Sequence, residues 1–176
     1  SIDLRGASEG GVHRAFSIAF KPDGTKMFIV NRPYPNNSAV FEYHLSTAWD
    51  ISTFSYDSNF NTNSQDSYMA GIAFNTDGTI MYLNGSQNLY KYTLTTGYDV
   101  STASYSNTSI DLSSQSNNSR GITFTPDGSR LFVCSAANDD IDEYGDMLWS
   151  EQQVLTGSDM SVNGTSGERF GRSVAI

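Results

Sequence analysis

The chain consists of short apolar runs separated by polar turns, and three stretches of it share one pattern. In each, an apolar run ending in phenylalanine leads into an Asp-Gly pair, and a second apolar or aromatic run follows directly. These stretches are residues 17–31, 71–85 and 121–135. Asp and Gly tolerate the positive φ angles of tight turns, so the pattern predicts three β-hairpins.

More strands follow each hairpin at similar distances. A third run ends in tyrosine in every unit, at residues 40–43, 89–92 and 141–144. A longer string, [ST]-T-x-[WY]-D-[IV]-S-T, then appears in the first two units, within residues 45–53 and 94–102. A fourth run follows this string, around residues 54–60 and 103–112. Each unit therefore predicts four strands.

The spacing of these units indicates the architecture. The Asp-Gly pairs at Asp23, Asp77 and Asp127 recur after 54 and then 50 residues. Four strands in a period of about fifty residues are typical of a propeller blade. We therefore predict an all-β chain, a β-propeller with three four-stranded blades and partial strands at both ends. The expected segment covers 1–176, with blades at about 12–62, 68–112 and 118–162 and a partial next blade at 163–176.

Two resemblances to known families lie on these strings. The F-x-x-D-G-[TS]-x-[ML]-[FY] segments resemble the first hairpin of YVTN and NHL propellers, over residues 15 to about 145. This resemblance implies the fold and almost nothing about activity. The tail, residues 149–156 and 167–176, resembles an FG-GAP repeat of integrin-α-type propellers. It lacks that family's G-A-P and its D-x-D-x-D-G calcium loop, so the resemblance implies no metal site.

The ends of the sequence fit inside the repeat. Residues 1–4 align with 109–112 in a last strand, and residues 173–176 align with 17–20 in a first strand. Three blades are fewer than the four to eight that usually close a propeller. We therefore expect either a homodimer that closes the ring or a longer chain of which these residues are part.

Composition and charge exclude several kinds of partner. Ten basic and nineteen acidic residues give a net charge of −9, which argues against nucleic acid and against anionic membrane surfaces. No apolar run approaches the length of about eighteen residues that a membrane-spanning helix needs. The single cysteine, Cys134, excludes an intrachain disulfide and a cysteine-rich zinc site, and we expect it to be buried and inert.

No catalytic set stands out in the sequence. His13 and His44 are the only histidines, and no G-x-S-x-G elbow is present. The acidic residues at 139, 140, 142 and 143 are expected to lie in a solvated turn, because they lack the spacing of a calcium loop. We therefore predict no catalytic residues and no metal ligands.

An enzyme remains the alternative, a calcium-dependent lactonase-like hydrolase with its site in the propeller channel. Calcium would be its cofactor, held by Glu, Asn and Asp side chains, as some propellers of similar appearance do. The predicted first strands offer no carboxylate at their channel positions, which are Ser17, Ala19, Gly71, Ala73, Gly121 and Thr123. The nearest candidates are Glu9 and Glu168 in the rim loops.

The loops that enter the first strands are the best candidates for a binding surface. They differ most between units, at residues 5–14, 61–68 and 113–120, and loops on a rigid scaffold commonly carry function. Arg14, Tyr68 and Arg120 stand at or near the entrance of these strands, so we predict that they bind ligand. Trp49 and Tyr98, at equivalent positions, are expected to pack one blade against the next.

These observations favour a binding or structural module of adhesion type over an enzyme. The acidic polar composition and the integrin-like tail suggest an extracellular location, on a cell or virion surface, in a marine bacterial or phage protein. The expected partner is a protein or carbohydrate ligand on one propeller rim, with no nucleic acid and no membrane insertion.

Overall fold

The computed structural model describes residues 3–4, 14–32, 38–113, 118–125, 127–136 and 139–145, and the backbone of 150–155. The described strands are β1 (Ala15–Phe20), β2 (Lys26–Asn31), β3 (Ala39–Leu45), β4 (Phe54–Asn61), β5 (Gly71–Phe74), β6 (Ile80–Asn84), β7 (Asn88–Leu94), β8 (Ala103–Asp111), β9 (Ser119–Phe124), β10 (Arg130–Ser135), β11 (Asp140–Gly145) and β12 (Ser150–Leu155). Two short 3₁₀ helices, η1 (Ile51–Thr53) and η2 (Val100–Thr102), precede β4 and β8.

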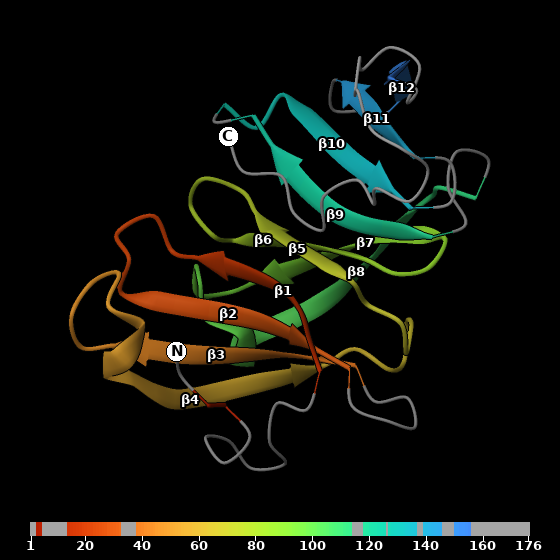
Figure 1. Ribbon diagram of the computed structural model, residues 1–176. Coiled ribbons are helices and arrows are strands. Elements are labelled where there is room, and N and C mark those ends of the chain that lie inside the picture. The colour runs from red at the N-terminus through yellow and green to blue at the C-terminus, as the bar shows by residue number, and fades with distance from the viewer. Residues whose placement is uncertain are drawn as a thin grey trace, which may run out of the picture.

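The strands form three four-stranded antiparallel sheets (Figure 1). We call them blade 1 (β1 to β4), blade 2 (β5 to β8) and blade 3 (β9 to β12), each ordered as consecutive neighbours. The first strands lie together, because β5 contacts both β1 and β9. The prediction of an all-β chain with three four-stranded units is confirmed. The predicted partial blade at 163–176 lies outside the described residues.

The three blades repeat one register. The phenylalanine that ends each first strand pairs with the first apolar residue of the second, as Phe20 with Met27, Phe74 with Met81 and Phe124 with Leu131. Pairing of the third and fourth strands shifts at the same place in each blade, just before the third-strand tyrosine. Alternation along these strands sends one set of side chains to each neighbouring blade.

The Asp-Gly turns are built alike in all three blades. Their glycines have φ angles of 71° to 73°, a region that side chains with a Cβ rarely adopt: Gly24, Gly78 and Gly128. In each turn the Asp carboxylate accepts a hydrogen bond from the backbone N–H two residues on, at 2.9 to 3.0 Å: Asp23, Asp77 and Asp127. These bonds fix the turn and hold the carboxylate in its ionised form.

The hydrogen-bonded turn aspartates make the stability of the fold depend on pH in the acid range. Hydrogen bonds from Thr125 and Ser129 lower the pKa of Asp127 to about 2, and equivalent bonds lower the pKa of Asp77. The native state therefore binds fewer protons than the unfolded chain just below pH 4, so the contribution to stability is lost as the pH falls from about 4 to 2. We expect the urea midpoint to fall over this range, and to fall less in Asp127→Asn.

The matched control for this measurement is Asp57→Asn. Asp57 is exposed in β4, and its carboxylate makes no hydrogen bond with any described residue. If both substitutions reduce the loss of stability in acid equally, the Asp-Gly turn is not the source of that loss.

The Tyr98 side chain fills the interface between blades 1 and 2, and we call it the plug. Tyr98 is 6% exposed, and its ring lies 5.3 Å from the Phe74 ring and 6.3 Å from the Phe28 ring, centroid to centroid. Its hydroxyl donates toward the carbonyls of Asn75 and Thr76, at 3.1 and 3.0 Å. The predicted packing role of Tyr98 is thus observed. Its backbone has φ 59°, which an aromatic residue adopts only under strong constraint.

Trp49, the equivalent residue of blade 1, packs within its own blade. It packs on Gly24 and on the Phe20 ring of its own blade, yet it is 59% exposed. The prediction that it packs against a neighbouring blade is not met among the described residues.

A buried charged pair joins the same two blades. Glu42 in β3 is fully buried; one carboxylate oxygen accepts from the Lys26 ammonium, and the other accepts from the backbone N–H of Val100 at 2.8 Å. Lys26 also donates to the carbonyl oxygen of Tyr98 at 2.9 Å. Lys26 and Glu42 of blade 1 thus hold the segment of blade 2 from Tyr98 to Val100, and we call this pair the clamp.

Two further expectations can be compared with the described residues. The solvated turn expected for the acidic residues around 140 is observed only at Asp139, which is exposed. The prediction is wrong for Asp140 and Asp142, which lie in β11 and are buried. Burial alternates from Asp140 to Tyr144, as expected for a strand and not for a turn. Cys134 is buried as expected, and burial followed by the charge of Asp142 raises its pKa. No described helix has the length and hydropathy needed to cross a membrane.

Candidate functional site: the arginine rim of the channel

The first strands of the blades enclose a cavity of about 510 Å³. Its walls carry small or apolar side chains from all three blades, including Ser17, Ala19, Ala73 and Thr123. None of its lining residues, as far as the structure describes them, is an Asp or Glu. The described wall of the channel is therefore uncharged, and charged side chains are to be sought at the ends of the channel.

At the end where the first strands begin, arginine side chains gather. Arg14 immediately precedes β1, Arg32 immediately follows β2, and Arg120 lies in β9. Arg14 and Arg32 are joined through the backbone, since the Arg32 N–H donates to the Arg14 carbonyl at 3.0 Å. An antiparallel hairpin returns to the level at which it started, which is why Arg32 arrives at this rim.

Aromatic rings hold Arg32 in place. Its guanidinium carbon lies 3.9 Å from the centroid of the Phe16 ring and 4.8 Å from that of the Tyr68 ring. Both distances are within the range of a cation–π contact. Tyr68 remains 45% exposed, so part of its ring is available to a ligand.

The three arginines influence one another. Burial lowers the pKa of Arg32 below its usual value, and the positive charges of Arg120 and then Arg14 add to this effect. Tyr68 and Asp66 act in the opposite direction. In a chain with ten basic residues and a net charge of −9, this rim concentrates positive charge in one place.

Asp66 organises the loop beside the arginines. Its carboxylate accepts hydrogen bonds from the backbone N–H of Tyr68 at 2.7 Å and from that of Ser86 at 3.2 Å. Gly85 permits this approach, because a Cβ at that position would stand 2.1 Å from an Asp66 carboxylate oxygen. The loop before β5 and the β6–β7 turn are therefore tied together, with the Tyr68 ring beside Arg32.

The structure brings together the three residues that the sequence singles out. Arg14, Tyr68 and Arg120 all act on Arg32, by backbone bonding, ring contact or charge. Arg32 and Phe16 are the functional candidates that the sequence argument missed. The signal for Arg32 was present, since it ends the second strand of a hairpin whose first strand follows Arg14.

The residues suggested for a metal are not assembled where the structure is defined. Glu9 and Glu168 lie outside the described residues. Among the described residues, no group of three or more His, Cys, Asp and Glu side chains is placed to hold a metal ion. His44 is exposed in β3, away from any such group.

Comparison with known proteins identifies the fold. No protein-family model and no curated protein matches the sequence. Hydrazine synthase from Kuenenia stuttgartiensis superposes with a TM-score of 0.57 at 17% identity, over 82% of this chain and 36% of that one. A candidate 6-phosphogluconolactonase from Bacteroides fragilis NCTC 9343 gives a TM-score of 0.57 at 12% identity, over 85% of this chain and 39% of that one. This chain is a β-propeller segment.

A third structure, a protein of unknown function from Desulfotomaculum acetoxidans DSM 771, gives a TM-score of 0.57 at 15% identity. It is covered over 43% of its length by 82% of this chain. The propeller segment thus spans about two fifths of the solved chains it matches. Identities this low establish a shared fold only, since one fold supports many activities.

Proposed function

We propose that this propeller segment is a non-catalytic binding module that recognises an acidic carbohydrate at its arginine rim. The observation that carries the proposal is the position of Arg32, held between the rings of Phe16 and Tyr68 with the charges of Arg14 and Arg120 nearby. The remainder of the described channel wall is uncharged, so the rim is the part suited to recognition.

The chemistry of these side chains favours a sugar that bears carboxylate or sulfate groups. A guanidinium presents paired N–H donors that match the oxygens of such anions, and partial burial strengthens each bond. The exposed part of the Tyr68 ring offers an apolar surface for the face of a sugar ring. The overall negative charge of the chain would repel a polyanion elsewhere and direct it to this rim.

The wider setting of this module is also part of the proposal. The repeat strings support kinship with YVTN and NHL propellers, and the tail supports an FG-GAP repeat, of which the structure describes only the backbone of β12. These strings are the support for placing the module, as part of the proposal, in adhesion on an extracellular, cell or virion surface. The exposed Trp49 face supports contact with a further blade, from a homodimer or an adjoining part of a longer chain.

Calorimetric titration with alginate oligosaccharides, and with neutral dextran oligosaccharides for comparison, tests this function. We expect alginate to bind and dextran not to bind. Arg120→Glu should weaken alginate binding by at least about tenfold, because a charged hydrogen bond is replaced by repulsion. Arg130→Glu is the control, since Arg130 lies at the Asp-Gly end of blade 3 and pairs with Glu143.

Raising the salt concentration should weaken binding to the wild-type protein more than to Arg120→Glu. Equal losses in Arg120→Glu and Arg130→Glu would place the anion elsewhere. Binding of acidic peptides with no binding of alginate would overturn the carbohydrate assignment.

A further inference from the structure

The boundary between blades 1 and 2 has two halves, one from each blade. Blade 2 contributes the string that contains Tyr98 and Val100, which are 6% and 0% exposed. Blade 1 contributes an acceptor face, on which Phe28 packs against the Tyr98 ring and the clamp holds the string. A second place in the chain that carries one of these halves is therefore a candidate for the same kind of contact.

Blade 1 carries a second string of this kind, folded in the same way. Trp49 and Tyr98 both have left-handed backbones, with φ of 66° and 59°. Both of their N–H groups donate to the carbonyl of a turn glycine, at 2.9 and 3.0 Å. The 3₁₀ helices η1 and η2 are also capped alike, by Asp50 and Asp99. The string of blade 1 is therefore preorganised for the contact that the string of blade 2 makes.

The apolar side chains of this first string are exposed. Trp49 is 59% exposed and Ile51 is 39% exposed, whereas both equivalent residues of blade 2 are buried. The Trp49 ring lies 5.4 Å from the Phe20 ring, as the Tyr98 ring lies 5.3 Å from the Phe74 ring. The third ring, which the preceding blade supplies to Tyr98, has no counterpart beside Trp49 among the described residues.

The rest of this side of blade 1 is built as a blade boundary. Leu4 and Phe20 pack against a buried cluster of blade 1 that includes Met27. At the boundary of blades 2 and 3 the equivalent residues pack together in the same way: Leu112, Phe124 and Leu131. The string around Trp49 is thus the exposed part of a side that otherwise resembles a filled boundary.

Blade 3 carries a second acceptor face. Phe132 and Glu143 are paired across β10 and β11, as Phe28 and Glu42 are paired across β2 and β3. Arg130 stands two residues before Phe132 and donates to Glu143 at 2.7 Å, as the lysine of the clamp donates to its glutamate. The cation, the ring and the carboxylate of the first boundary are therefore all repeated.

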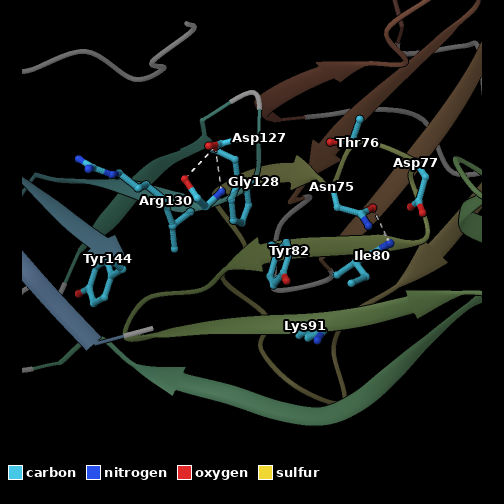
Figure 2. Close-up of a pocket in the computed structure, with 13 residues that line it drawn as sticks. Asn75, Thr76, Asp77, Ile80, Tyr82, Lys91, Asp127, Gly128, Arg130 and Tyr144 are labelled. Atoms are coloured by element: carbon cyan, nitrogen blue, oxygen red, sulfur yellow. Dashed lines mark hydrogen bonds between the residues drawn. The ribbon is translucent and has the colours of Figure 1, made fainter. Parts of the chain in front are cut away.

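This second acceptor face is turned away from blade 2. Leu131 and Val133 pack against blade 2, so alternation along β10 directs Phe132 to the other side. Figure 2 shows the Arg130 side chain extending away from Tyr82 of blade 2. The face is therefore directed toward the position of a following blade.

The acceptor face of blade 3 lacks the bonds that a string supplies at the first boundary. Both oxygens of Glu42 are bonded there, one to Lys26 and one to the N–H of Val100. In Glu143 one oxygen accepts from Arg130, and no described residue donates to the other. The Arg130 side chain is 54% exposed, whereas that of Lys26, which also reaches the string, is 17% exposed.

We propose that blade 3 of one copy of this chain binds the Trp49 string of a second copy, and that two copies thereby form one ring of six blades. The Trp49 ring then packs on Phe132. The Ile51 N–H donates to the second oxygen of Glu143. Arg130 donates to the Trp49 carbonyl. Each contact repeats one that joins blades 1 and 2, and six blades lie within the range of four to eight that closes a propeller.

The proposal deepens one part of the proposed function, the contact of the Trp49 face with a further blade, and it rests on that part alone. The arginine rim lies within a single copy, so binding of alginate does not require the ring. Within the ring both copies run in the same direction around one axis. Their two arginine rims therefore face the same end of the channel.

Light scattering of the whole chain without carbohydrate, between about 1 and about 100 μM, tests the proposal. We expect the mass to rise from one copy to two and no further. Trp49→Ala and Glu143→Ala should each weaken association by at least about tenfold, because each removes a central contact. Trp49→Tyr supplies the residue that blade 2 uses, so it should keep the association. Ile18→Ala is the matched control, since Ile18 is 50% exposed and lines the channel cavity.

Circular dichroism at about 1 μM, where the copies are separate, checks that each variant is folded. A wild-type mass of one copy over the whole range, or growth beyond two copies, would overturn the proposal. So would undiminished association in Trp49→Ala or Glu143→Ala. Because no carbohydrate is present, the result is independent of whether alginate binds.

Discussion

Replacing Glu42 with alanine is expected to lower the free energy of unfolding by about 3 to 5 kcal/mol, the cost of leaving a buried charge without its partner. The Lys26 ammonium keeps only the Tyr98 carbonyl as an acceptor, and the Val100 N–H loses its acceptor at a place where Glu42 has no exposed surface. Urea denaturation at pH 7 measures the change. Because the clamp joins two blades, the loss should appear in blade 1 and blade 2 together.

The matched control is Glu143→Ala. Glu143 holds the same position in blade 3 and pairs with Arg130 at 2.7 Å, but the Arg130 side chain is 54% exposed. Exposed ion pairs contribute about 0 to 1 kcal/mol, so this variant should change stability little. Similar losses in the two variants would contradict the distinction between a buried clamp and a surface pair.

The titration of Glu42 has the opposite sign to that of the turn aspartates. Burial raises its pKa, against the hydrogen bonds from Lys26 and Val100. The native state therefore takes up a proton at higher pH than the unfolded chain, so this group's contribution declines as the pH rises past the unfolded pKa. Removing Glu42 should consequently make the remaining acid dependence steeper.

Tyr98→Ala should destabilise the chain by about 3 to 5 kcal/mol, the usual cost of removing a large buried aromatic side chain. The substitution removes ring packing on Phe28 and Phe74, opens a cavity between blades 1 and 2, and removes one hydrogen-bond donor from each of two backbone carbonyls. Tyr98→Phe keeps the ring and should cost about 1 kcal/mol for the lost hydroxyl bonds.

Trp49→Ala provides the comparison in the same chain. Trp49 has the same sequence context and also packs over a turn glycine, but its side chain is 59% exposed. We expect its removal to cost less than half as much as removal of Tyr98. Equal costs would show that Trp49 is covered in solution, and light scattering would then establish whether a second copy covers it.

The sequence was sufficient to predict the repeat, because each of its signals is local. The Asp-Gly turns, the third-strand tyrosines and the string around Trp49 and Tyr98 are each local to about ten residues, and they recur every 49 to 54 residues, the string in the first two units only. The solvated turn expected around Asp140 was wrong for Asp140 and Asp142 for a related reason. Charge suggested a turn, whereas Asp142 pairs with Val133 in β10 and Val154 in β12, which no local pattern reveals.

The candidate site was predictable in part. Arg14, Tyr68 and Arg120 could be placed on one rim because all of them enter first strands. Arg32 reaches the same rim from the far end of a hairpin, and its contact with Tyr68 crosses from blade 1 to the loop before blade 2.

Unequal blade boundaries have a consequence for how the molecule opens. Blades 1 and 2 share the Tyr98 plug and the buried Glu42 clamp, whereas the described residues at the boundary of blades 2 and 3 line a cavity of about 470 Å³ (Figure 2). A cavity at a boundary removes packing contacts, and fewer contacts lower the free energy that local opening requires. We therefore expect blade 3 to unfold first, as its own cooperative unit. Its amide hydrogens should exchange through partial unfolding, whereas those of blades 1 and 2 should exchange only through global unfolding.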